Sequence, residues 1–120
     1  ICLLATALKN LKYIDKLGVA YMVLTNKTLK KYNFKRGDTE GFVNFGLRIN
    51  GVSLSVIFIE DKNENLIKIS FRSKKNLDVN RFAKKYFSGG GHKNAAGGFS
   101  KDSIHETEKK FISSIHEFLK

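Results

Sequence analysis

The residues best suited to bind an anion lie in one short stretch, residues 88–98, which reads SGGGHKNAAGG. Its three consecutive glycines can turn their amides toward one point, as in backbone nests that bind anions, and they have no Cβ to keep a ligand away. His92 and Lys93 follow at once and add polar contacts. We therefore predict a loop that holds a phosphate. The amide donors would be those of Gly89, Gly90 and Gly91.

This stretch does not match a known nucleotide motif. No Lys-Ser or Lys-Thr pair follows the glycines, as in a Walker loop, and the spacing is not that of the dinucleotide fingerprint. The small residues Ala95, Ala96 and Gly97 come next and would let the following element pack close beneath the loop. Glycine runs also form ordinary turns, so a flexible turn with a surface histidine stays open as the alternative.

Basic residues are concentrated just before and within this stretch. Residues 72–93 contain seven basic residues and a single acid, Asp78, and so carry over half of the formal net charge of +11. The basic residues are Arg72, Lys74, Lys75, Arg81, Lys84, Lys85 and Lys93. A positive field of this kind favours phosphate-rich partners. A solvated lysine face is the alternative.

A predicted strand over residues 66–73 ends within this basic cluster. Its positions 67, 69 and 71 are apolar, so Ser70 and Arg72 would be neighbours on the polar face. Arginine can bind phosphate through two parallel hydrogen bonds. Arg72 is therefore a second candidate phosphate ligand, with an ordinary edge-strand arginine as the alternative.

The sequence contains no recognisable catalytic motif. The three histidines do not cluster, and no Asp-x-Asp, His-Glu-x-x-His or Cys-x-x-Cys motif occurs. Metal-dependent hydrolysis needs several ligands of these types around the ion. A nucleophile-elbow pattern is also absent, although a Ser/His/Asp triad stays open at this stage. The residues alone predict a basic domain that binds phosphate, with no metal site and no catalytic residue.

The predicted elements place these residues in an α/β fold, with a mixed β-sheet of four to five strands and flanking helices. Helices are expected at 2–17, at 26–32, from about 38 onward, at 78–87 and at 103–119. Strands are expected at 19–25, 53–60, 66–73 and 95–99. Gly18 would end the first helix, and Asn26 would cap the second.

Length and composition indicate one globular domain, because the chain has 120 residues and 42% of them are hydrophobic. No apolar run approaches the ~20 residues that a membrane span needs, so we expect no membrane partner. The single cysteine, Cys2, cannot form an internal disulfide, which favours the cytoplasm. The chain begins at Ile1, without an initiator Met, and we expect a further domain upstream.

The ordered set of motifs resembles the DHH-associated domain, which is the C-terminal half of the DHH phosphoesterases. Residues 89–92 (GGGH) and 95–97 (AAG) are similar to its glycine-histidine motif, and residues 70–73 (SFRS) precede them. Further similar stretches lie at 20–25, 38–44, 51–60 and 78–80. The chain resembles one branch in particular, the bacterial nanoRNase/pAp phosphatases, also known as exopolyphosphatase-related proteins.

The resemblance implies that residues 18–120 are the DHH-associated substrate-binding domain and that residues 1–17 are the end of an interdomain linker helix. The preceding DHH domain would hold two manganese ions through Asp and His residues, including the Asp-His-His triplet that this chain lacks. The whole enzyme would hydrolyse short oligoribonucleotides and remove a phosphate from pAp. This chain alone would bind these substrates and leave them uncut.

The resemblance also implies contacts for the residues before the glycine stretch. Arg72 would bind the substrate phosphate, with Ser70 and Ser73 of the same motif beside it. Glu40 lies in another family motif and is a further candidate, with no role assigned.

Within the glycine stretch, the resemblance implies a phosphate held near the metal ions. His92, Lys93 and the amides of Gly89–Gly91 would hold it, and Ala95–Gly97 would support the loop.

Other functions stay open. A stand-alone module that binds single-stranded nucleic acid would explain the net charge of +11 and the aromatic residues near the basic cluster. Its binding would strengthen with oligonucleotide length and fall steeply with salt. The matching domain of a RecJ-type exonuclease is another alternative, because its glycine-histidine motif is similar. A domain used mainly for subunit contact has no specific support.

Overall fold

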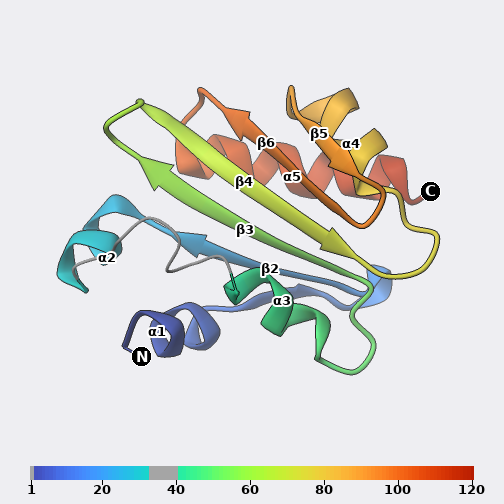
Figure 1. The fold of residues 1–120 in the computed structure, drawn as a ribbon, viewed down its shortest axis with the longest axis horizontal. Coiled ribbons are helices and arrows are strands. Elements are labelled where there is room, and N and C mark those ends of the chain that lie inside the picture. Colours follow the sequence, from blue (N-terminus) through green and yellow to red (C-terminus); the bar gives the residue numbers. More distant parts are fainter. Residues whose placement is uncertain (1, 33–40) are drawn as a thin grey trace.

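A six-stranded mixed sheet with helices on both faces forms the fold (Figure 1). The computed structural model describes residues 2–32 and 41–120. The elements, in chain order, are α1 (Cys2–Lys9), β1 (Lys12–Ile14), the 3-10 helix η1 (Asp15–Leu17), β2 (Val19–Leu24), α2 (Asn26–Lys31), α3 (Phe42–Leu47), β3 (Leu54–Asp61), β4 (Leu66–Ser73), α4 (Val79–Tyr86), β5 (Gly90–His92), β6 (Ala95–Ser100) and α5 (Ile104–Phe118).

The strands lie in the order β1-β2-β3-β4-β6-β5. The pair β2 and β3 is parallel, and every other neighbouring pair is antiparallel. The α/β class and the mixed sheet are confirmed. The sheet has more strands than the predicted four to five because β1 and β5, of three residues each, lie in segments predicted as helix and loop.

The N-terminal segment differs from the helix predicted over residues 2–17. Helix α1 ends at Lys9, and residues 12–14 pair with β2 as an antiparallel edge strand. Gly18 makes this reversal: its φ of 67° is in the left-handed region, where the chain turns out of η1 into β2. The spacing of apolar side chains in residues 2–17 suits a helix. Residues 12–14 form a strand instead, because they pair with the buried strand β2. The role of this segment as an interdomain linker stays a prediction.

One core lies between the sheet and helices α4 and α5, where aromatic rings pack edge to face. Phe111 of α5 lies 5.5 Å from Tyr21 and 5.2 Å from Phe58, measured between ring centroids. Phe82 of α4 lies 5.5 Å from Phe71. Each such pair contributes about 0.5–1.5 kcal/mol beyond the burial of its area. These contacts hold both helices on one face of the sheet.

A second core lies on the opposite face, under helices α1, α2 and α3. Met22 and Ile57 of the sheet cluster there with Leu29 of α2 and with Phe42 and Val43 of α3. The two faces of β3 therefore contribute to different cores, as its predicted alternation requires. In Figure 1 the two sets of helices lie on opposite sides of the sheet.

Helix starts follow the predicted capping residues in two of three cases. At the start of α4 the Asp78 side chain accepts a hydrogen bond from the Arg81 amide, and at the start of α5 the Ser103 side chain accepts one from the Glu106 amide. The cap of α2 is Thr25 instead of Asn26, because the Thr25 hydroxyl accepts from the Thr28 amide. The predicted turn at 35–38 and the helix start at 38–40 lie outside the described residues.

A polar contact ties α5 to the N-terminal strands. The hydroxyl of Tyr21 and the ammonium group of Lys12 both donate to Glu108 Oε2, each at 2.7 Å. Burial, together with the hydrogen bond to Glu108 and its charge, raises the pKa of Tyr21 above its ordinary value. Burial opposes ionisation of Glu108, but the bonds from Lys12 and Tyr21 and the charges of Lys12 and His105 outweigh it and lower the pKa of Glu108.

In the described part of the chain, every helix is too short or too polar to cross a lipid bilayer.

Candidate functional site

The candidate phosphate ligands come together on one face of the sheet. Arg72 of β4 pairs with Ala95 of β6, and Ala95 pairs with His92 of β5. Residues paired across neighbouring strands project to the same face. Arg72, Ala95 and His92 therefore form a row across three strands.

The next row on the same face contains very little side chain. Ser70 of β4 pairs with Gly97 of β6, and Gly97 pairs with Gly90 of β5. These two rows define the open face, made of Ser70, Arg72, His92, Ala95 and Gly97, whereas a Cβ at Gly90 would point toward Asn80 and Lys84 of α4. The helices on this side of the sheet lie toward β2 and β3, and Figure 1 draws none of the described helices over β5 and β6 there. Gly97 and one small serine make this part of the sheet a shallow platform.

Arg72 is held at the platform by bonds to the backbone. Its Nη1 donates to the carbonyls of Phe71 (2.9 Å) and Ala96 (3.4 Å), and its side chain is half-buried. Among the described residues no partner is found for Nε and Nη2. The guanidinium is therefore held at Nη1 by backbone carbonyls, and its further N–H donors are on Nε and Nη2. His92 is exposed at the edge strand.

The glycine stretch is a strand and turn, where a phosphate loop was predicted. The amide of Gly89 donates to the carbonyl of Ala83 (3.1 Å), and that of Gly91 donates to Asn80 Oδ1 (2.8 Å). Two of the three amides that would hold an anion thus have partners inside the domain. The glycine at 89 serves close packing instead, because a Cβ there would collide with the carbonyl oxygen of Gly97. The backbone at Gly89 therefore lies directly against the backbone of Gly97.

Ser73 and Asn94 form a structural contact on the other side of the platform. Ser73 is buried, and its hydroxyl donates to the carbonyl of Leu77 (2.6 Å). The side-chain amide of Asn94 donates to Ser73 Oγ (2.9 Å) and to the carbonyl of Lys75 (3.2 Å). Asn94 was not among the predicted site residues, and its position in the turn between β5 and β6 is the only sequence signal for it. Together these side chains fix the loop that leads from β4 to α4.

The remaining predicted site residues are spread over several positions. Lys93 lies in the turn after β5, and its ammonium group donates to Asn76 Oδ1 at 3.1 Å. Ala96 is buried on the α4 side, whereas Ala95 and Gly97 belong to the open face. The small residues thus support the hairpin from both sides. Glu40 lies outside the described residues.

The basic cluster of residues 72–93 is divided by the sheet. Arg72 lies on the open face, but Arg81, Lys84 and Lys85 belong to α4, which packs on the opposite face. Lys74 and Lys75 are in the loop before α4. All these basic residues are close to the glycine stretch in sequence, but only some of them lie beside the candidate ligands in the structure.

Within residues 2–32 and 41–120, no three His, Cys, Asp or Glu side chains gather as ligands of a metal ion.

Comparison with known families identifies the domain to which these residues belong. The family model described as the DHHA1 domain matches residues 15–120, which is most of the chain. The chain belongs to the DHHA1 domain family. The predicted resemblance to the DHH-associated domain is thereby confirmed, and this DHHA1 domain includes both rows of the open face.

Two relatives are each about one-third identical to this DHHA1 domain over the aligned residues. The probable bifunctional oligoribonuclease and PAP phosphatase NrnA of Streptococcus mutans is 36% identical over 84 residues, covering 70% of this chain and 26% of the relative. The crystal structure of an exopolyphosphatase-related protein from Bacteroides fragilis is 36% identical, with a TM-score of 0.94, covering 98% of this chain and 34% of that one. The chain thus spans about a quarter to a third of the length of these proteins.

A more distant structure shows the same fold. The pGpG-specific phosphodiesterase PggH from Vibrio cholerae has a TM-score of 0.67 at 13% identity, covering 97% of this DHHA1 domain and 37% of that chain. At this identity the likeness concerns the fold alone.

Proposed function

We propose that this DHHA1 domain is the substrate-binding part of a metal-dependent phosphoesterase that hydrolyses short oligoribonucleotides, pAp, or both. Membership of the family and the 36% identity to the Streptococcus mutans relative, whose name states these two activities, support this assignment. Because the chain spans 26% of that relative, the chemistry would belong to the remainder of a longer protein. We place two manganese ions in that preceding DHH domain.

The row of Arg72, Ala95 and His92 carries the proposal. Arginine offers a planar set of donors that matches the oxygens of a phosphate, and Arg72 keeps Nε and Nη2 for this purpose. His92 lies across the small side chain of Ala95 on the same face. A phosphate bound above Ala95 would receive hydrogen bonds from both sides.

The second row gives the rest of the ligand room to lie against the sheet. Gly97 has no side chain, and Ser70 adds one hydroxyl at the β4 end of the row. The backbone of β6 can therefore be approached closely by a sugar or a base. In this arrangement side chains bind the phosphate, since the amides of Gly89 and Gly91 already have partners.

Because binding is assigned to this domain and the chemistry to the rest of a longer protein, we expect this domain to bind substrate without cleaving it. The described residues provide phosphate donors but no gathered metal ligands. Hydrolysis would require the two faces of a cleft, with this open face presenting the substrate to the metal ions of the other domain.

The test is an amide NMR titration of the 120-residue chain with pAp and with a 5′-phosphorylated diribonucleotide. We expect shifts confined to residues 70–72, 90–92 and 95–97. The matched control is Arg81→Ala, which removes an arginine from the opposite face and should leave the titration with pAp unchanged. Shifts spread over the lysine surface, or equal loss of binding in Arg81→Ala and Arg72→Ala, would reject the open face as the site.

A further inference from the structure

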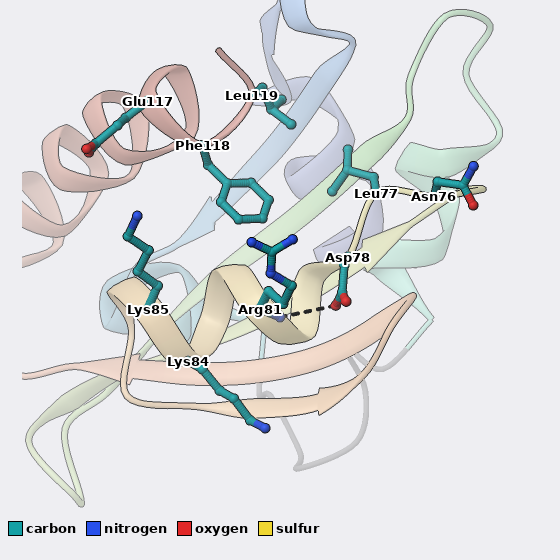
Figure 2. Close-up of a pocket in the computed structure, with 9 residues that line it drawn as sticks. All are labelled: Asn76, Leu77, Asp78, Arg81, Lys84, Lys85, Glu117, Phe118 and Leu119. Atoms are coloured by element: carbon teal, nitrogen blue, oxygen red, sulfur yellow. Dashed lines mark hydrogen bonds between the residues drawn. The ribbon is translucent and has the colours of Figure 1, made fainter.

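A hollow on the side of the domain opposite the open face lies between α4 and the C-terminal end of α5 (Figure 2). It has a volume of about 620 Å³. Its lining combines basic and apolar side chains. They are Asn76, Leu77, Asp78, Arg81, Lys84, Lys85, Glu117, Phe118 and Leu119.

Two basic residues of α4 border the space that faces α5. The guanidinium of Arg81 lies over the ring of Phe118, 5.9 Å from its centroid, and in Figure 2 it points toward that ring. Lys85 lies on the same side of α4, whereas Lys84 is directed away from the hollow. The carboxylate of Asp78 is engaged at the helix start, where Oδ1 accepts from the Arg81 amide at 3.1 Å. Charges of both signs therefore line this hollow: Arg81 and Lys85 face it, and Asp78 and Glu117 also border it.

A second hollow adjoins the first. It has a volume of about 750 Å³, and it shares Asn76, Leu77 and Leu119 with its neighbour. Its charged lining residues are all basic: Lys16, Lys74 and Lys75. The two hollows form one continuous surface, which we call the α4–α5 groove, with six basic and two acidic lining residues.

The lysines of the second hollow are carried on a loop that is held in place. The Lys74 amide donates to the carbonyl of Ser53 (3.0 Å), and the Asn94 side chain donates to the carbonyl of Lys75 (3.2 Å). Lys75 has a φ of 55°, a conformation that L-residues adopt only when their surroundings require it. A loop held by these bonds presents its ammonium groups from a fixed backbone, which lowers the entropic cost of binding a polyanion.

We propose that the α4–α5 groove binds the phosphate backbone of a single-stranded nucleic acid, at a site separate from the open face. Positive side chains along a groove track successive phosphates, and apolar or aromatic surface between them accommodates bases. The groove offers both, since Arg81 and Lys85 flank the apolar patch of Leu77, Phe118 and Leu119. A strand of several nucleotides can use this groove, whereas a mononucleotide gains little from charges so far apart.

The groove explains the basic residues that the open face leaves unused. Arg81 and Lys85 are on α4, and the sheet lies between them and the row of Arg72 and His92. One domain would thus hold a small ligand on one side and a longer strand on the other.

The experiment measures binding of fluorescent oligouridylate of about twelve nucleotides to the 120-residue chain by anisotropy, across a range of salt concentrations. The test variant is the pair Arg81→Glu and Lys85→Glu. The matched control is the pair Lys27→Glu and Lys30→Glu, which makes the same change of charge at exposed positions of α2. All four side chains are exposed, so the fold should survive each pair.

We expect the groove pair to weaken binding by at least tenfold at low salt and the control pair by less than threefold. The plot of log K against log salt should become shallower by about 1.4 for the groove pair, because each phosphate contact on a single strand contributes about 0.7. Titration with pAp should be unaffected, which separates this groove from the open face. Oligothymidylate of equal length should bind similarly, since the contacts are to phosphates.

Three results would overturn the proposal. The first is an equal loss of affinity in the groove and control pairs, which would mean that only net charge matters. The second is unchanged binding in the groove pair. The third is displacement of the RNA by polyglutamate as readily as by unlabelled oligouridylate, which would mean that the groove takes an acidic polypeptide as well.

Discussion

Arg72 and His92 lie two strands apart in one cross-strand row, and only the methyl group of Ala95 stands between them. Neighbouring strands are about 4.8 Å apart, so the two backbones are separated by about 10 Å. Both side chains are long enough to lean over Ala95 from opposite sides. We propose that the three residues outline a binding position for one tetrahedral anion on the surface of the sheet.

A double-mutant cycle tests whether Arg72 and His92 share one phosphate. Arg72→Ala and His92→Ala should each weaken pAp binding by about 10- to 150-fold, since a hydrogen bond to a charged group contributes about 1.5–3 kcal/mol. The double variant should lose less than the product of the two effects, because the second substitution acts on a phosphate already released. Isothermal titration calorimetry gives the affinities. Full additivity would assign the two side chains to different phosphates.

Substitution of Gly97 tests whether ligand lies on the second row of the open face. A Cβ at this position would meet only the carbonyl of Ile69, at 3.4 Å, so Gly97→Ala should fold normally. Its methyl group would project onto the platform and weaken pAp binding by about 5- to 150-fold, which corresponds to about 1–3 kcal/mol of overpacking. Thermal unfolding and calorimetry on the same sample separate the two effects.

The neighbouring glycine provides the control for that experiment. A Cβ at Gly98 would lie 2.8 Å from the carbonyl oxygen of Phe87, so Gly98→Ala should lower the melting temperature. If Gly97→Ala lowers the melting temperature as much as Gly98→Ala does, or leaves pAp binding intact, the platform is not a ligand surface.

Asn94→Ala tests the contact that fixes the loop between β4 and α4. The substitution leaves Ser73 Oγ and the carbonyls of Lys75 and Leu77 without the amide that now donates to them. Because unmet polar groups cost about 1–3 kcal/mol, the free energy of unfolding in urea should fall by this amount. Asn63→Ala, at an exposed position of the β3–β4 turn, should change it by less than about 0.5 kcal/mol. An equal loss of unfolding free energy in the two variants would show that Asn94 does not hold this loop.

The contact of Glu108 with Lys12 and Tyr21 predicts a dependence of stability on pH. The folded state lowers the pKa of Glu108 below its ordinary value of 4.5. A carboxylate with a lowered pKa stabilises the fold above that value, and the contribution is lost as the pH falls through the folded pKa. Glu108→Gln should therefore reduce the free energy of unfolding by about 1 kcal/mol at neutral pH.

Urea titrations of the parent chain and of Glu108→Gln at a series of pH values give the comparison. Their difference should shrink steadily below about pH 4.5. A difference that is constant down to the acid limit would show that Glu108 acts through packing alone. Tyr21→Phe is the companion variant, because it removes the hydroxyl that donates to Glu108 and keeps the ring in the aromatic core.

The sequence by itself determined the family, the α/β class and most of the regular elements. Strong local signals account for this: the apolar strand β2, the alternation of β4 and the caps of α4 and α5 depend on residues close together in the chain. The same alternation correctly placed Ser70 and Arg72 on one face. These features follow from strand and helix periodicity and from local hydrogen bonds, which need no knowledge of distant partners.

Tertiary structure decided what local patterns leave undetermined. Residues 12–14 became a strand because β2 offers a free edge, and the glycine stretch became a strand because β6 pairs with it. The partners of the Gly89 and Gly91 amides, Ala83 and Asn80, come from α4, which the spacing of the glycines does not encode.

The distribution of charge was likewise decided by the fold. Arg72 and Arg81 are close in sequence, but β4 and α4 place them on opposite sides of the sheet. His92 joins Arg72 only through the pairing of both strands with β6. Strand order and register bring residues together or apart by packing over the whole domain, and this is the physical reason that the binding surfaces emerge only in three dimensions.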